Sequence, residues 1–186
     1  MKTKFLFSAL LICLSGFGLA ASAQTKQPKT VRDFFMLLPA KYFSLDCCID
    51  KNARQGKEEY LELYLSVEDT ANGYMSGGDG AQDGFAMALF KRSNGTYLIA
   101  FYTYGEGGVE DTSWTVFLDY KNGKWTDVSR AVVPNYNARK YIYQLPREGT
   151  TIGVFEKDET GEDFYKGKKL YDLIWQNDKF SRSGKR

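Results

Sequence analysis

The sequence predicts a mainly β protein: an antiparallel meander of about ten short strands that closes as a barrel or a sandwich, with one short N-terminal helix. Apolar and polar residues alternate over several short stretches, which is the two-residue period of a half-buried strand. The aromatic content of 16% indicates a packed core, since disordered chains contain few aromatic residues. Between the alternating stretches stand residue pairs typical of tight turns, namely Asn72-Gly73, Asn94-Gly95, Asn122-Gly123, Glu148-Gly149 and Asn177-Asp178.

Residues 1–23 have the pattern of a cleavable signal peptide. Lys2 and Lys4 precede a short apolar stretch, and the sequence Ala-Ser-Ala at 21–23 is a small-residue cleavage pattern. The apolar stretch is too short to indicate a membrane-spanning helix. We therefore expect a mature chain that begins at Gln24 and is periplasmic or secreted.

Length and charge limit what the mature chain can be. About 160 residues remain after the leader, enough for one domain with a substantial core. The leader contains two of the 25 Lys and Arg residues and none of the 23 Asp and Glu residues, so the mature chain is formally neutral. A neutral chain without a long basic run is not expected to bind nucleic acid, and no later apolar run is long enough for a transmembrane segment. We expect a helix and an irregular segment over 24–59 and an antiparallel β domain over 60–186, together one globular domain over 30–183.

The first expected elements follow in chain order. A capping box that begins at Thr30, followed by apolar residues at helical spacing, predicts a short helix that ends before Pro39. Charged residues without a clear period predict an irregular segment up to residue 59. The period then changes to two, which predicts the first strand, with one face formed by Leu61, Leu63, Leu65 and Val67.

Later strands are placed by the turns between them. The hairpin around Asn94-Gly95 has apolar residues on both faces, so we expect it at the centre of the sheet and covered on both sides. The strand over 114–120 is apolar mainly on one face and is expected to be half exposed. Two-residue turns would place each aromatic residue after a turn across from a residue of the preceding strand, in the pairs Tyr97 with Arg92, Trp125 with Tyr120, and Phe180 with Trp175.

A meander also predicts where binding residues gather. Each hairpin sends the chain out and back, so the tight turns lie at one end of the strands and the longer connections at the other. Irregular loops on one rim of a rigid sheet are a usual place for binding residues. We call this expected site the loop end; its connections are 76–84, 104–112, 130–138 and 157–167.

Two glycine-rich connections of the loop end carry carboxylates that are expected to approach one another. Such groups, with nearby main-chain carbonyls, suit calcium, which takes about six to eight oxygen ligands. No other cofactor is expected. The spacing matches neither the EF-hand nor the nonapeptide calcium repeat, so solvated loops are the alternative reading. The candidate calcium ligands are Asp79, Asp83, Glu110 and Asp111.

The sequence restricts catalysis. It contains no histidine, which excludes Ser-His-Asp and Cys-His mechanisms. An enzyme would depend on paired carboxylates, as glycoside hydrolases do, with Asp83, Glu106 and Glu110 as the candidates. Because no spacing fixes the separation of these groups, we expect a non-enzymatic protein and keep a carboxylate-dependent hydrolase that acts outside the cytoplasm as the alternative.

Aromatic residues indicate a binding function. Rings that stack on sugars or line a small cavity would serve a binding protein, although rings at alternating strand positions also pack cores and pair across strands. We expect the partner to be an envelope protein, a saccharide or a small ligand. The candidate binding residues are Tyr102, Tyr104, Trp114 and Tyr136.

Overall fold

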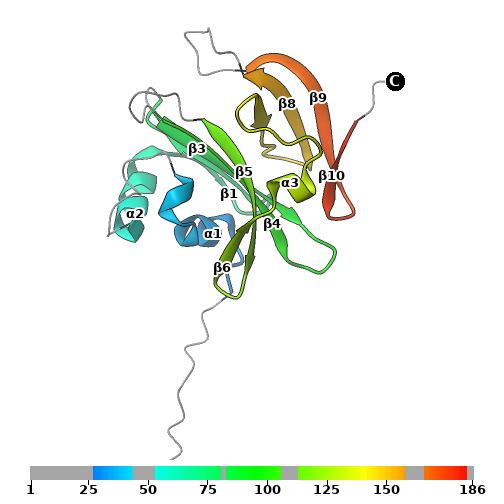
Figure 1. Ribbon diagram of the computed structural model, residues 1–186. Coiled ribbons are helices and arrows are strands. Elements are labelled where there is room, and N and C mark those ends of the chain that lie inside the picture. The colour runs from blue at the N-terminus through cyan, green and yellow to red at the C-terminus, as the bar shows by residue number, and fades with distance from the viewer. Residues whose placement is uncertain (1–26, 44–52, 81–82, 106–112, 158–165, 184–186) are drawn as a thin grey trace, which may run out of the picture.

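The computed structural model describes residues 27–43, 53–80, 83–105, 113–157 and 166–183. In these ranges the chain is mainly β, and consecutive strands pair antiparallel in two sheets (Figure 1). The six-stranded sheet has the order β1 (Leu65–Asp69), β2 (Tyr74–Gly78), β3 (Asp83–Lys91), β4 (Tyr97–Gly105), β5 (Trp114–Lys121), β6 (Lys124–Asp127). The four-stranded sheet has the order β10 (Lys179–Arg182), β9 (Lys166–Gln176), β8 (Thr151–Lys157), β7 (Tyr141–Gln144).

The predicted β class is confirmed, and so is the pairing of consecutive strands within each sheet; β6 and β7 lie in different sheets, and closure as a barrel is not found among the described strands. Each sheet ends in its own edge strands, β1 and β6 in one and β7 and β10 in the other. No helix in the described ranges has the length and apolar character needed to cross a membrane. The helices are α1 (Val31–Leu37), the short 3-10 helix η1 (Ala40–Tyr42), α2 (Ala53–Tyr64) and α3 (Ser129–Val132). The expected leader, residues 1–23, lies outside the described ranges.

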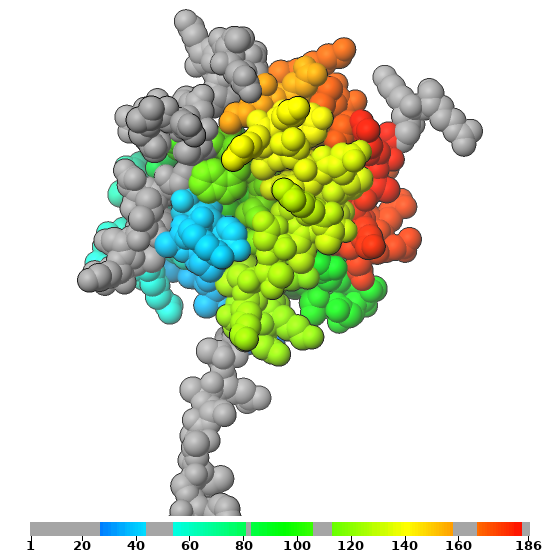
Figure 2. All heavy atoms as spheres, viewed as in Figure 1, coloured from blue at the N-terminus to red at the C-terminus, as the bar shows by residue number. Residues whose placement is uncertain are grey.

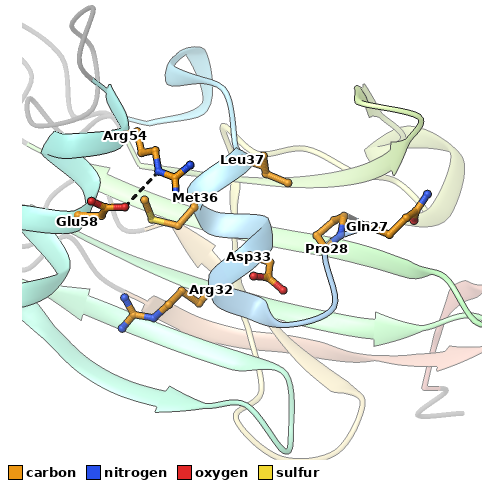
Figure 3. A pocket seen from close by; sticks show the side chains of 8 residues that line it. All are labelled: Gln27, Pro28, Arg32, Asp33, Met36, Leu37, Arg54 and Glu58. Carbon is orange, nitrogen blue, oxygen red and sulfur yellow. Dashed lines mark hydrogen bonds and ion pairs between the residues drawn. The ribbon is translucent and has the colours of Figure 1, made fainter. Parts of the chain in front are cut away.

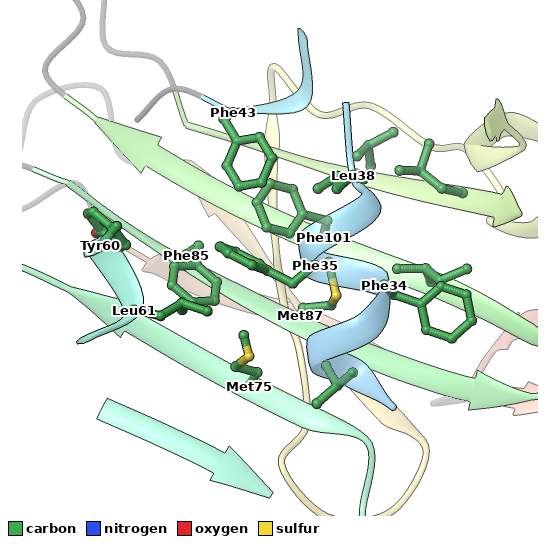
Figure 4. Packing of buried hydrophobic residues seen from close by; sticks show 14 residues of the cluster. Phe34, Phe35, Leu38, Phe43, Tyr60, Leu61, Met75, Phe85, Met87 and Phe101 are labelled. Atoms are coloured by element: carbon green, nitrogen blue, oxygen red, sulfur yellow. The ribbon is translucent and has the colours of Figure 1, made fainter. Parts of the chain in front are cut away.

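Helix α1 begins at a capping box. The main-chain N–H of Asp33 donates to the Thr30 hydroxyl oxygen at 3.1 Å, and the Thr30 N–H donates to the Asp33 carboxylate at 3.0 Å. These bonds satisfy donors that have no partner inside the helix. Phe35 projects from α1 onto the six-stranded sheet, with its ring centroid 4.6 Å from that of Phe85 and 6.4 Å from that of Phe101 (Figure 4).

The prediction of a first strand from Leu61 is wrong for its first four residues, because α2 extends to Tyr64 and β1 begins only at Leu65. The segment before it, predicted to be irregular, is helical from Ala53. Tyr60 and Leu61 are buried against the six-stranded sheet, while Leu63 is 71% exposed. The buried residues at helical spacing therefore determine the structure up to Tyr64, and the alternating leucines do not form a strand there.

The six-stranded sheet is covered on both faces. Helices α1 and α2 pack on one face and the four-stranded sheet packs on the other (Figure 1). The β3–β4 hairpin is central and buried on both sides, as predicted. The prediction that the second face of β5 is exposed is wrong, because Thr115 and Phe117 are fully buried beneath α3 and the four-stranded sheet.

The tight turns gather at one end of the molecule, as predicted from the meander. In the six-stranded sheet the turns after β1, β3 and β5 are all on the same side of the strands. The turns of the two sheets meet there: the N–H and hydroxyl of Ser93 donate to the Asp178 carboxylate at 2.9 and 2.6 Å, and Arg147 forms an ion pair with Asp69 at 3.1 Å. We call this side the turn end.

Two of the three predicted cross-strand pairs are confirmed. Trp125 lies opposite Tyr120 and Phe180 opposite Trp175, each pair with ring centroids 4.9 Å apart. The third is wrong, because Tyr97 lies opposite Lys91. The connection from β3 to β4 is longer than a two-residue turn, since the N–H of Arg92 still donates to the Thr96 carbonyl at 2.8 Å.

Candidate functional site

The loop end contains two of the carboxylates singled out in the sequence. Asp79 follows β2 and Asp83 begins β3, whereas Glu106, Glu110 and Asp111 lie outside the described residues. The structure therefore shows one part of the candidate calcium set and one of the three candidate catalytic carboxylates.

Asp79 and Asp83 accept hydrogen bonds from the protein itself. The N–H of Asp83 donates to the Asp79 carboxylate at 3.1 Å, and the Tyr60 hydroxyl donates to the Asp83 carboxylate at 2.7 Å. Burial and the neighbouring Asp83 raise the pKa of Tyr60, so this hydroxyl stays a donor. The first bond joins Asp79, after β2, to Asp83, at the start of β3, and the second links α2 to Asp83. Among the described residues, no three His, Cys, Asp or Glu side chains gather as a metal site would require.

Three of the four candidate aromatic residues lie on the side of the six-stranded sheet that faces the other sheet. Tyr102 and Tyr104 are neighbours, with ring centroids 5.8 Å apart, and Tyr136 donates its hydroxyl to the Thr115 carbonyl. Burial raises the pKa of Tyr136. Trp114 packs on the opposite face, against the core beneath the helices. The four residues therefore do not form one aromatic surface.

Tyr104 also lies close to its own sheet. Gly84 is directly opposite it on β3, and a Cβ atom at Gly84 would overlap the Tyr104 ring. Because Gly84 has no side chain, the Tyr104 ring can lie across β3. The ring is therefore used for packing within the sheet.

A pocket lies at the turn end, between the tips of two hairpins. β4 and β5 pair only as far as Leu98 and Asp119, and beyond this point each strand continues into its own hairpin. The two tips are separate lobes in Figure 2, green for β3–β4 and yellow-green for β5–β6. We call the space between them the fork pocket. It has a volume of about 400 Å³ and is lined by Gln27, Arg92, Asn94, Thr96, Tyr97, Asp119, Tyr120, Lys121 and Asn122.

Each tip is tied to a different layer of the protein. The indole N–H of Trp175 donates to the Lys91 carbonyl at 3.1 Å, which adds to the Ser93–Asp178 bonds and holds the β3–β4 tip against the four-stranded sheet. The indole N–H of Trp125 donates to the Leu37 carbonyl at 3.1 Å and holds the β5–β6 tip against the end of α1. The residues that form these bonds do not line the pocket.

Two aromatic residues and one ion pair line the fork pocket from opposite faces of the six-stranded sheet, the tyrosines from the helix side and the ion pair from the side of the four-stranded sheet. Tyr97 and Tyr120 are half-buried, and each ring packs edge-on with Phe34 at a centroid distance of 6.0 Å. The Arg92 guanidinium donates to the Asp119 carboxylate at 2.6 Å, which links the two hairpins. The Arg92 side chain is 15% exposed and that of Asp119 is 40% exposed, so a ligand can reach both groups.

A second pocket lies between helices α1 and α2. This helix groove has a volume of about 430 Å³ (Figure 3). Its charged groups already have protein partners: Arg32 binds Glu68 at 2.6 Å, Arg54 binds Glu58 at 3.2 Å, and Asp33 caps α1. The other lining residues are Gln27, Pro28, Met36 and Leu37, so the groove has no aromatic ring in its lining.

Sequence reasoning missed the fork pocket because its residues have other readings. Asn94 and Asn122 indicate turns, and Arg92, Tyr97 and Tyr120 indicate cross-strand pairs. The pocket exists because β4 and β5 stop pairing beyond Leu98 and Asp119, and the sequence carries no signal for this point. Recognising it requires knowledge of which strands pair.

Comparison of the chain with known protein families, curated proteins and solved structures finds no match.

Proposed function

We propose that this is a non-enzymatic binding protein that acts outside the cytoplasm, periplasmic or secreted, and that it takes a small ligand in the fork pocket. Export is supported by the leader pattern of residues 1–23. The scaffold is best described as a sandwich of two sheets with helices on one outer face, and such a rigid body suits a preformed site.

The observation that carries the proposal is the anchoring of the two hairpin tips. Trp175 fastens one tip to the four-stranded sheet and Trp125 fastens the other to α1, each with a 3.1 Å hydrogen bond. A site that is already open loses little conformational entropy when a ligand enters, which favours affinity. The volume of about 400 Å³ lies in the range usual for small-ligand sites.

Blocking the pocket tests this proposal. Lys121 is exposed and lines the pocket, whereas Lys124 lies directly opposite it on the same hairpin and does not. Ligand-observed NMR with pools of saccharides, amino acids, nucleosides and short peptides would identify a ligand. We expect Lys121→Trp to weaken its binding at least about tenfold, equal to about 1.4 kcal/mol, because the indole fills the pocket.

The matched control is Lys124→Trp, which should leave the affinity unchanged. If no pool contains a ligand, or if Lys121→Trp binds as the wild type does, the proposal fails.

The alternative, a carboxylate-dependent hydrolase, would act at the loop end. Its described candidate is Asp83, which Tyr60 holds by a 2.7 Å hydrogen bond. Turnover of chromogenic glycosides that is lost on Asp83→Asn would favour the enzyme, while a binding protein should show no turnover in the wild type. Asp79 and Asp83 accept bonds from the chain itself, so calcium is not part of our proposal.

A further inference from the structure

We propose that the ligand of the fork pocket is a neutral saccharide, whose sugar ring contacts Tyr97 and Tyr120 and whose neighbouring hydroxyls bind Arg92 and Asp119. This inference names the ligand class and rests on the proposed function. It is carried by the composition, the hydrogen-bonding groups and the charge of the pocket.

The lining contains no aliphatic side chain. Two of its residues are aromatic, Tyr97 and Tyr120, and the other lining residues carry amides, a hydroxyl or charged groups. Acyl chains and other aliphatic ligands would displace water from these polar groups without forming hydrogen bonds to them, which is unfavourable. A sugar ring has both a C–H face that contacts an aromatic ring and hydroxyls at its edge, so it matches both kinds of surface.

Arg92 and Asp119 offer donors and an acceptor side by side. One guanidinium nitrogen of Arg92 donates to Oδ1 of Asp119 at 2.6 Å. Arg92 has further N–H donors in a fixed plane, and Asp119 has a second carboxylate oxygen. Two adjacent sugar hydroxyls each donate and accept, so they can bind both partners of the pair at once. Bonds to charged groups are stronger than bonds between neutral groups.

Asn94, which also lines the pocket, adds a donor. Its side-chain oxygen accepts from the N–H of Thr96 at 3.0 Å and from the Thr96 hydroxyl at 2.7 Å. The oxygen is thereby fixed, and the amide N–H groups of Asn94 remain to donate to a ligand.

The charge of the pocket favours a neutral ligand. Arg92 and Asp119 compensate each other, and Lys121 is the one lining residue with an uncompensated charge among those the structure describes. Lys121 is exposed to solvent, where a single charge interacts weakly with a ligand. A site for an anionic ligand would place its cations inside the pocket without a carboxylate between them.

Substitution of Asp119 tests the ligand class. Calorimetric titration of the full mature chain would use neutral di- and tetrasaccharides of glucose, galactose and mannose, with the corresponding uronic acid oligosaccharides in parallel. We expect at least one neutral saccharide to bind, and Asp119→Asn to weaken it at least about tenfold, because the pair loses its charged acceptor. Tyr120→Leu, which keeps apolar volume but removes the ring, should weaken it by a similar factor.

The matched control is Asp172→Asn. Asp172 is also a strand residue in a surface ion pair, is 34% exposed compared with 40% for Asp119, and does not line the pocket. The Asp172→Asn variant should bind saccharide as the wild type does. Thermal unfolding checks that each variant is folded.

The outcomes separate the two proposals. Binding of uronic acid oligosaccharides alone, or of a non-saccharide ligand that Lys121→Trp blocks, overturns the ligand class and leaves the proposed function standing. The proposed ligand class is also overturned if a saccharide binds but neither Asp119→Asn nor Tyr120→Leu weakens its binding. If no ligand of any class binds, both proposals fail.

Discussion

Lys57 shows how a single buried charge organises the helical layer. It is 2% exposed, and its ammonium group donates to the main-chain carbonyls of Met36 at 3.3 Å and Leu38 at 2.5 Å. Carbonyl groups at the end of a helix have no partner within it, so Lys57 of α2 satisfies those at the end of α1. Its nitrogen also lies 4.8 Å from the ring centroid of Phe43. Burial lowers the pKa of Lys57 from its usual 10.5 to about 8.

This lowered pKa predicts a pH-dependent stability. Between about pH 8 and the usual pKa, the unfolded chain holds the Lys57 proton and the folded protein has lost it, so the free energy of unfolding rises with pH. Relative to Lys57→Met, we expect the free energy of unfolding of the wild type to rise by about 2 kcal/mol between about pH 7.5 and about pH 9.5. Urea denaturation at each pH measures it.

The comparison with Lys57→Met removes the contribution of the tyrosines. Burial raises the pKa of Tyr60 and Tyr143, which destabilises the folded protein once unfolded tyrosines ionise near about pH 10. Both proteins share this effect. A difference in stability that is constant over the pH range would show that Lys57 does not titrate as described.

At the scale of elements, the sequence predicted the hairpins well and the α2–β1 boundary poorly. Asn-Gly pairs placed the turns because left-handed backbone is required there, as Asn122 and Gly123 show with φ values of 51° and 76°. Leu61, Leu63 and Leu65 fit the period of a strand, but burial of Tyr60 and Leu61 against the sheet decided for a helix. Only the tertiary contact distinguishes the two periods over so short a stretch.

Trp125 is predicted to control the opening of the fork. Trp125→Phe removes the indole N–H that binds the Leu37 carbonyl and keeps a ring opposite Tyr120. We expect amide hydrogen exchange in the β5–β6 hairpin to become faster, since the lost bond contributes on the order of 1 kcal/mol. Trp114→Phe, on the same sheet and away from the pocket, is the control. Unchanged exchange in the hairpin of Trp125→Phe would mean that the tip is held by other contacts.

At the scale of the molecule, the fork depends on all three layers. The six-stranded sheet supplies both hairpins, while the helices hold one tip and the four-stranded sheet holds the other. The sequence predicted the sorting of tight turns to one end, which is a property of any meander. It left a barrel and a sandwich open, because strand periodicity shows which residues are buried and not which sheet buries them. Binding was predicted at the loop end, whereas our proposal places it at the turn end.

Mapping the ligand onto the chain tests the central claim most directly. Titration of isotope-labelled protein with the neutral saccharide that binds best, followed by backbone amide chemical shifts, locates the site without any substitution. The account predicts that the largest shifts lie in Lys91–Tyr97 and in residues 119–124, on the two sides of the fork. Shifts concentrated at Gly78, Gly84 and Tyr104, or on helices α1 and α2, would contradict it.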